Sequence, residues 1–188
     1  MKREKRNWSD PPVYRTRYLP DGDLHGSYFV PESIIVATRD ALTSFALAGI
    51  RDGGHEGMAF WAGREHEGST YFMQAIVPDA EHSDQRVMAS AASVGMAARI
   101  ARERMLGILC QVHSHPGSDT RHSDGDDDLV LLPFEGMLSI VVRDFGLHFS
   151  TFEDFSVHQF QNGRWVLCSP KSVKTGLIIV PSWVDLRG

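Results

Sequence analysis

A short alternating segment that ends at a proline sets the tightest limit on how this chain can fold. Leu106 to His115 alternates as a buried strand, and Pro116 stops it, because proline cannot donate a hydrogen bond to a sheet. Residues two apart in a strand project from the same face. His113 and His115 are therefore expected to extend together from one face, at the point where this strand gives way to a loop.

An acidic residue follows these two histidines at a short distance along the chain. Asp126 comes after His115 with ten residues between them, and Ser123 precedes Asp126 by three, the interval that places two residues on one face of a helix's first turn. A catalytic zinc site uses three protein ligands and keeps a fourth position open. The pattern thus predicts a Zn²⁺ site made by His113, His115 and Asp126.

Each part of this pattern also has a purely structural interpretation. Ser123 is a suitable N-cap residue, and the acidic run from Asp126 to Asp128 complements the dipole at a helix N-terminus. Two histidines on one strand face are often surface residues. Because the parts occur together at this spacing far less often by chance than either does alone, the combination favours the metal site.

The remaining pattern predicts one domain of mixed α/β class with a central sheet. We expect an arm over residues 1–26, the domain over 27–168 and an extension over 169–188. The expected helices cover residues 31–50, 86–105 and, as a short one, 124–132. The expected strands cover residues 28–30, 56–63, 70–77, 106–115, 137–143, 147–152, 155–161 and 164–168, with a hairpin turn at 162–163.

Composition narrows the setting in which the chain works. Its 188 residues carry a net charge of −5, and the first six residues are basic, so the body is more acidic than the total suggests and nucleic acid is not expected as a partner. No apolar run reaches the roughly 18 to 20 residues that span a bilayer, so no membrane association is expected. Two cysteines and no secretory signal pattern favour the cytoplasm.

The motif His113-Ser114-His115-Pro116, followed by Ser123 and Asp126, resembles the signature of the JAMM, or MPN+, metallopeptidases. The resemblance implies a central mixed β-sheet flanked by two long helices and one short helix. In that family a glutamate at the start of the strand after the first long helix is followed seven residues later by glycine, which matches Glu56 and Gly63. One departure is Ala59, where the family often has glycine.

The resemblance also implies roles for the two remaining site residues. Glu56 would act as the general base, outside the metal shell, and pass a proton from the attacking water to the leaving amine. The Ser123 hydroxyl would donate a hydrogen bond to the carbonyl oxygen as it becomes negative. Zinc contributes by lowering the pKa of water from about 15.7 to near 7.

The sequence indicates the substrate less directly than it indicates the reaction. The resemblance implies an isopeptidase or peptidase that cuts after the C-terminal Gly of a ubiquitin-like protein or its conjugate. Ubiquitin-activating-like and ubiquitin-conjugating-like proteins are expected as further partners, in a bacterial conjugation or antiviral defence operon. Two other functions remain open, a non-catalytic scaffold that keeps the fold and a relative associated with DNA repair.

Other histidines carry weaker signals. His55 and Glu56 do not begin an HExxH zinc motif, because Ala59 takes the place of the second histidine. Two histidines, His55 and His122, are next to predicted site residues and are candidates for supporting roles. We expect His158 and the rest to be surface or structural residues.

Overall fold

The computed structural model describes residues 18–123, 126 and 133–182. Its helices are α1 (Glu32–Ala48), α2 (Ala91–Glu103) and α4 (Pro170–Gly176), with short 3-10 turns η1 (Ile50–Asp52) and η2 (Asp144–Gly146). Its strands are β1 (Asp21–Gly22), β2 (Ser27–Pro31), β3 (Met58–His66), β4 (Ser69–Ile76), β5 (Ala80–His82), β6 (Val87–Ala89), β7 (Gly107–Ser114), β8 (Leu138–Val142), β9 (Phe155–Gln161), β10 (Arg164–Cys168) and β11 (Leu177–Val180).

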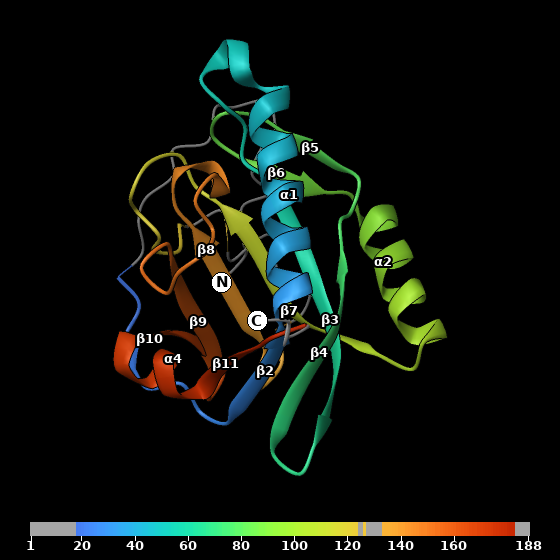
Figure 1. Cartoon of the computed structure of the whole chain (residues 1–188), viewed down its shortest axis with the longest axis vertical. Coiled ribbons are helices and arrows are strands. Elements are labelled where there is room, and N and C mark those ends of the chain that lie inside the picture. The colour runs from blue at the N-terminus through green and yellow to red at the C-terminus, as the bar shows by residue number, and fades with distance from the viewer. Residues whose placement is uncertain (1–17, 124–125, 127–132, 183–188) are drawn as a thin grey trace, which may run out of the picture.

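Nine of these strands form one curled, mixed sheet in the order β1-β10-β9-β8-β7-β3-β4-β2-β11. The β7–β8 pair is parallel, whereas β7 pairs with β3 and β8 with β9 in the antiparallel sense. Strands β5 and β6 form a separate two-stranded ribbon beside the end of β3 (Figure 1). The predicted fold class, mixed α+β with a central sheet and helices, is confirmed.

The two long helices cover different parts of the sheet (Figure 1). α1 contributes Ile34, Ile35 and Leu42 to the larger apolar cluster, together with Trp61 of β3. The Trp61 indole N–H also donates to the Thr38 hydroxyl of α1 at 2.8 Å, which satisfies two polar groups inside this cluster. α2 packs by its small residues against a second cluster on the other face of β3 and β7, made of Met58, Phe60, Ala62, Ile76, Val87, Val94, Ala97 and Ala101.

The register between β3 and β7 determines which side chains lie together at one end of the sheet. Met58 lies directly opposite His113, and the Ser114 N–H donates to the Gly57 carbonyl oxygen at 3.0 Å just beyond it. Because directly paired residues share a sheet face, Met58 and His113 extend to the same side of the sheet, the side on which Met58 packs with residues of α2. Glu56 and His115 lie just beyond the ends of these strands, close enough for their side chains to interact electrostatically.

Several local predictions are confirmed. The β3–β4 pair is the expected hairpin, with β3 running on to His66 and β4 starting at Ser69 because the turn is confined to Glu67 and Gly68. The β9–β10 turn has Asn162 at φ 50° and Gly163 at φ 78°. Both lie in the left-handed region that a tight two-residue hairpin of this kind requires.

The predicted helix over residues 86–105 is too long at its start. Residues 87–89 form β6, and α2 begins at Ala91 after Ser90, whose hydroxyl accepts a hydrogen bond from the Ser93 N–H at 3.1 Å. The alanine-rich composition therefore marks the helix correctly. The N-cap serine determines where the helix begins. The residues before it form a strand instead, in which the Val87 side chain is buried.

The strand predicted over residues 147–152 is wrong, because turns occupy this segment. One oxygen of Asp154 accepts hydrogen bonds from the backbone N–H groups of Ser150 and Thr151, at 3.1 and 2.8 Å. Such local bonds satisfy the backbone groups that a strand would have paired. The apolar residues of this segment are buried individually and not as one face of a strand. Phe149 is completely buried in the core.

The sheet continues beyond residues 27–168, the range in which the sequence places the domain. β1 pairs with β10 in the parallel sense, and β11, after α4, pairs in the parallel sense with β2. The predicted short helix over residues 124–132 lies outside the described residues, except for Asp126. Within the part that the structure describes, no helix is long and apolar enough to cross a membrane.

Candidate metal centre

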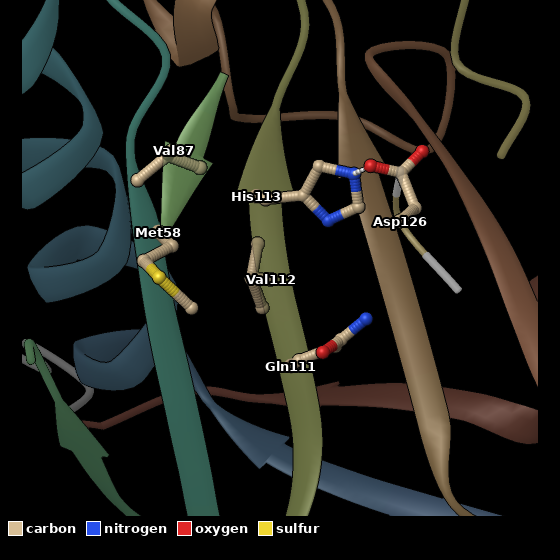
Figure 2. A pocket seen from close by; sticks show the side chains of 6 residues that line it. All are labelled: Met58, Val87, Gln111, Val112, His113 and Asp126. Carbon is tan, nitrogen blue, oxygen red and sulfur yellow. Dashed lines mark ion pairs between the residues drawn. The ribbon is translucent and has the colours of Figure 1, made fainter. Parts of the chain in front are cut away.

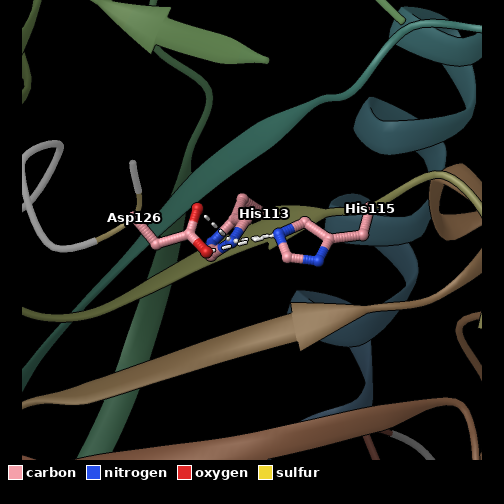
Figure 3. Close-up of side chains that lie close together, drawn as sticks. All are labelled: His113, His115 and Asp126. Carbon is pink, nitrogen blue, oxygen red and sulfur yellow. Dashed lines mark hydrogen bonds and ion pairs between the residues drawn. The ribbon is translucent and has the colours of Figure 1, made fainter. Parts of the chain in front are cut away.

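Three side chains converge at the carboxyl end of β7 (Figure 3). His113 Nε2 lies 3.1 Å from Asp126 Oδ1, and His115 Nε2 lies 3.4 Å from Asp126 Oδ2. The two Nε2 atoms are 3.2 Å apart. The three predicted metal ligands are therefore brought together, although they come from two segments separated by a loop.

These separations can be compared with the geometry of zinc. Nitrogen and oxygen ligands lie about 2.0–2.2 Å from zinc, so two of them at tetrahedral positions are separated by roughly 3.3–3.5 Å. The observed 3.1–3.4 Å is close to that spacing. The residues present therefore fit a small divalent cation held by two imidazoles and one carboxylate.

A further contact fixes the orientation of one imidazole. His115 Nδ1 lies 2.9 Å from the carbonyl oxygen of Asp119, which can only accept a hydrogen bond. Nδ1 must then carry the proton, and in the neutral ring Nε2 keeps its lone pair for a metal. The loop after β7 thus sets the tautomer of the histidine that precedes it.

Asp126 and His115 at this centre shift each other's pKa values toward their charged forms. Burial opposes ionisation of Asp126, but the neighbouring imidazoles His113 and His115 outweigh it and hold its pKa well below the usual range. Burial likewise tends to lower the pKa of His115, yet the Asp126 and Glu56 carboxyl groups raise it overall. A site with this much negative potential favours a bound cation.

Ser123 contacts Asp126 through its backbone. The Ser123 N–H donates to Asp126 Oδ2 at 2.6 Å, and the Asp126 N–H donates to the Ser123 carbonyl oxygen at 3.2 Å. A side chain at the third helical position that reaches back to the N-cap N–H is one half of a capping box. The structural interpretation of this Ser-Asp spacing is therefore compatible with the metal-binding one, since one carboxylate oxygen serves both.

Glu56 stands at the edge of the same centre and is 7 % exposed. Its backbone is held on both sides. Its own N–H donates to the Ser83 carbonyl oxygen at 2.8 Å, and the next N–H, of Gly57, donates to the Ser114 hydroxyl at 2.9 Å. Burial raises the pKa of Glu56 to about 8, and Asp126 adds to the shift while His115 opposes it.

A strained turn supports the far side of the centre. Asp144 and Phe145 both have positive φ, at 51° and 56°, an uncommon conformation for residues with a side chain. The Phe145 N–H donates to the His115 carbonyl oxygen at 2.8 Å, and its ring lies so close to Gly54 that a Cβ there would approach it to 2.9 Å. The turn thereby packs the strand that carries the candidate metal ligands His113 and His115 against the segment leading to Glu56.

A small, mostly apolar pocket opens beside the metal ligands (Figure 2). Met58 and Val87 line one side of it, and His113 points from β7 toward Asp126. The pocket has room for about one water molecule. Neither Met58 nor Val87 is identifiable from the sequence alone, because the wall forms only when the β5–β6 ribbon packs beside β3.

Two buried histidines lie beside the centre: His122, in the loop after β7, which the sequence marks as a candidate for a supporting role, and His158 of β9. His122 and His158 are both completely buried, and their rings stack with centroids 4.0 Å apart. Burial lowers the pKa of His122 well below its usual range and that of His158 to about 3, so both are neutral. His55, the other predicted supporting residue, pairs instead with His82, their Nδ1 atoms 2.8 Å apart.

A mixed α+β fold with a His-His-Asp centre at the end of one central strand defines a JAB/MPN-type domain. This chain belongs to the family of prokaryotic homologs of the JAB domain, which it matches over residues 38–155. All five predicted site residues lie within that range.

One relative agrees with this assignment in sequence, and one solved structure has a similar fold. The chain is 31 % identical over 134 residues to a probable metalloprotease of Sinorhizobium fredii, covering 69 % of this chain and 82 % of that protein. Its fold is similar to the solution structure of a Desulfitobacterium hafniense protein, with a TM-score of 0.60 and 12 % identity over 82 % of this chain and 94 % of the other. A crystal structure of a JAB1/MPN domain protein from Archaeoglobus fulgidus matches with a TM-score of 0.43 and 15 % identity, over 82 % and 97 % of the two chains.

Proposed function

We propose that this protein is a zinc-dependent peptidase that hydrolyses the bond after the C-terminal Gly of a ubiquitin-like protein, during deconjugation or precursor processing. The observation that carries the proposal is the convergence of His113, His115 and Asp126 beside a buried glutamate, Glu56, whose carboxyl group interacts electrostatically with His115 and Asp126. The Sinorhizobium relative, which is named a probable metalloprotease, supports the reaction class. A non-catalytic scaffold would have no need to keep this donor set.

The residues of the chain divide the reaction between them. Zinc bound by His113, His115 and Asp126 supplies Lewis acidity toward water and the scissile carbonyl. Glu56 accepts a proton as the water oxygen bonds to the carbonyl carbon, and gives that proton to the amine nitrogen as the carbon–nitrogen bond breaks. The Ser123 hydroxyl donates to the carbonyl oxygen while that oxygen carries negative charge.

The raised pKa of Glu56 suits this role. A carboxyl group with a pKa of about 8 holds its proton more tightly than an exposed glutamate, and a general base works best when its pKa lies near the working pH. A cation beside Glu56 would lower that pKa toward neutrality, because it favours the ionised carboxylate. The apolar surroundings thus raise the pKa of Glu56, whereas a bound metal would lower it.

The narrow pocket supports the proposed substrate. Met58 and Val87 crowd the space next to His113 and Asp126, so a residue beside the scissile bond has little room for a side chain. A flexible tail that ends in Gly meets this condition, whereas a folded loop would first have to unfold to extend into the site. Ubiquitin-activating-like and ubiquitin-conjugating-like proteins are the proposed partners that produce such conjugates.

Mass spectrometry of the products tests the proposal directly. The substrate is a ubiquitin-like protein fused through its C-terminal Gly to a second domain, and the control enzyme is Glu56→Gln. We expect a single cut after Gly with the wild-type protein and none with the control. Equal cutting of unstructured chains at large side chains would contradict the specificity, and no cutting of any peptide by the zinc-loaded protein would contradict the activity.

A further inference from the structure

The loop of residues 116–122 leads from the candidate ligand His115 to Ser123, which holds Asp126, and it is attached to the rest of the domain at two points. The Asp144 N–H donates to the Gly117 carbonyl oxygen at 2.8 Å, and the Thr120 and Ser156 hydroxyls lie 2.6 Å apart. Residues 116–119 and 121 are exposed. His122 alone among residues 116–122 is buried, with none of its surface accessible.

The surroundings of His122 are built to receive this ring. His122 Nε2 lies 2.9 Å from the Ser139 hydroxyl of β8, which also accepts a hydrogen bond from the Gln111 side chain of β7 at 3.0 Å. The ring stacks on His158 of β9 and meets the edge of Trp165 of β10, at centroid distances of 4.0 and 5.3 Å. One loop side chain therefore contacts three successive strands of the sheet.

The next residue along the chain transmits this anchoring to the metal centre. Ser123 follows His122 directly, and its N–H holds Asp126 Oδ2 at 2.6 Å. The other side of Asp126 faces His113 at 3.1 Å. Because only one peptide unit separates the buried ring from this N–H, the position of the ring fixes where the carboxylate is held.

We propose that His122 is a positioning residue, which anchors the loop to the sheet so that Asp126 is held in place to complete the metal centre. The inference rests on the proposed metal site but concerns a residue that neither binds the metal nor touches the substrate. Loss of a residue that positions a metal ligand typically lowers metal affinity by roughly 10- to 100-fold.

Zinc affinity, measured by competition with a chromogenic chelator, tests the proposal. We expect His122→Ala to bind zinc at least about 10-fold more weakly than the wild type. His122→Gln places an amide nitrogen near the position of Nε2, where it can still reach the Ser139 hydroxyl, and should recover most of the affinity. Zinc affinity within twofold of the wild type in a folded His122→Ala would overturn the inference.

A matched control separates anchoring from general loss of stability. Leu177 is equally buried but lies on β11, at the opposite edge of the sheet from β10 and β9. Leu177→Ala should lower thermal stability and leave zinc affinity unchanged. If Leu177→Ala weakens zinc binding as much as His122→Ala does, the effect is not one of position and the inference fails.

A smaller substitution covers the case in which His122→Ala does not fold. Ser139→Ala removes only the hydroxyl that meets His122 Nε2, and we expect a several-fold loss of zinc affinity. Trypsin cleavage after the exposed Arg121 should also be faster in this variant, because the loop is released more often. Unchanged affinity and unchanged cleavage would overturn the inference, whereas absence of zinc binding in the wild type would overturn the proposed function along with it.

Discussion

The Ser123 N–H holds Asp126 Oδ2 at 2.6 Å, so the backbone of one predicted site residue positions the side chain of another. This contact separates two roles of Ser123 that the sequence could not distinguish. The N–H belongs to every residue type except proline, whereas the hydroxyl belongs to serine. Substitution of the side chain should therefore affect catalysis and leave the metal in place.

Ser123→Ala is expected to keep its zinc and to lose about 10²- to 10³-fold in turnover, the cost of removing one donor to a developing oxyanion. Its stability should fall by no more than about 1 kcal/mol, through the weakened helix cap. Metal analysis, steady-state kinetics and a thermal melt of the same preparation check all three. A variant that loses its zinc would show that the hydroxyl, and not the N–H, supports Asp126.

Glu56→Gln should keep zinc and lose at least about 10²-fold in turnover, because glutamine cannot accept the proton. The raised pKa adds a test in the metal-free protein. A carboxyl group that titrates near 8 when folded and near 4.5 when unfolded stabilises the fold at acidic pH, and that stability is lost as the pH rises from 4.5 through 8.

Urea unfolding of the chelator-treated protein measures this second effect. The difference in stability between Glu56→Gln and the wild type should shift by roughly 3 kcal/mol in favour of the variant between pH 4.5 and pH 7. A constant difference across that range would mean that the pKa of Glu56 is close to its usual value.

His158 provides a second test of pH-dependent stability, in which stability is lost as the pH falls. Its folded pKa of about 3 lies below the unfolded value of 6.5, so its contribution to stability is complete above pH 6.5 and is lost as the pH falls toward 3. At pH 5 the wild type should have lost about 2 kcal/mol through this group. His158→Gln should lack that part of the acid sensitivity, and equal pH slopes for the two proteins would contradict it.

Met58 is expected to limit which residue fits beside the scissile bond. Met58→Ala should enlarge the pocket next to His113 and allow cleavage of a substrate that ends in Ala, which the wild type cuts poorly. The ratio of kcat/KM for Gly and Ala substrates measures this change. Cleavage of both substrates in an unchanged ratio would exclude this pocket from specificity.

The sequence predicts which three side chains come together at the candidate metal centre, because the constraints on them are local. Two histidines on one strand face share that face in any register, and a proline after them ends the strand regardless of the surroundings. Asp126 was identified by its distance from Ser123, an interval that the helix turn imposes. Glu56, by contrast, is predicted only by the family resemblance, because its closeness to His115 depends on how β3 packs against β7.

The parts that the sequence missed depend on contacts between distant segments. His122 is a candidate from its place next to Ser123, but no periodicity indicates that it packs against Ser139 and His158 on two strands. The false strand over residues 147–152 failed for a related reason. Its apolar residues suggested a strand, but Asp154, further along the chain, satisfies the same backbone groups within a turn.

The zinc content of purified protein tests the central claim most directly. Elemental analysis after removal of loosely bound metal should find about one zinc per chain in the wild type and almost none in His115→Ala, since one of the three protein ligands is gone. His55→Ala, which removes a histidine that pairs with His82 and is not one of the three converging ligands, serves as the control and should keep its zinc. Equal zinc in the wild type and in His115→Ala would contradict the account.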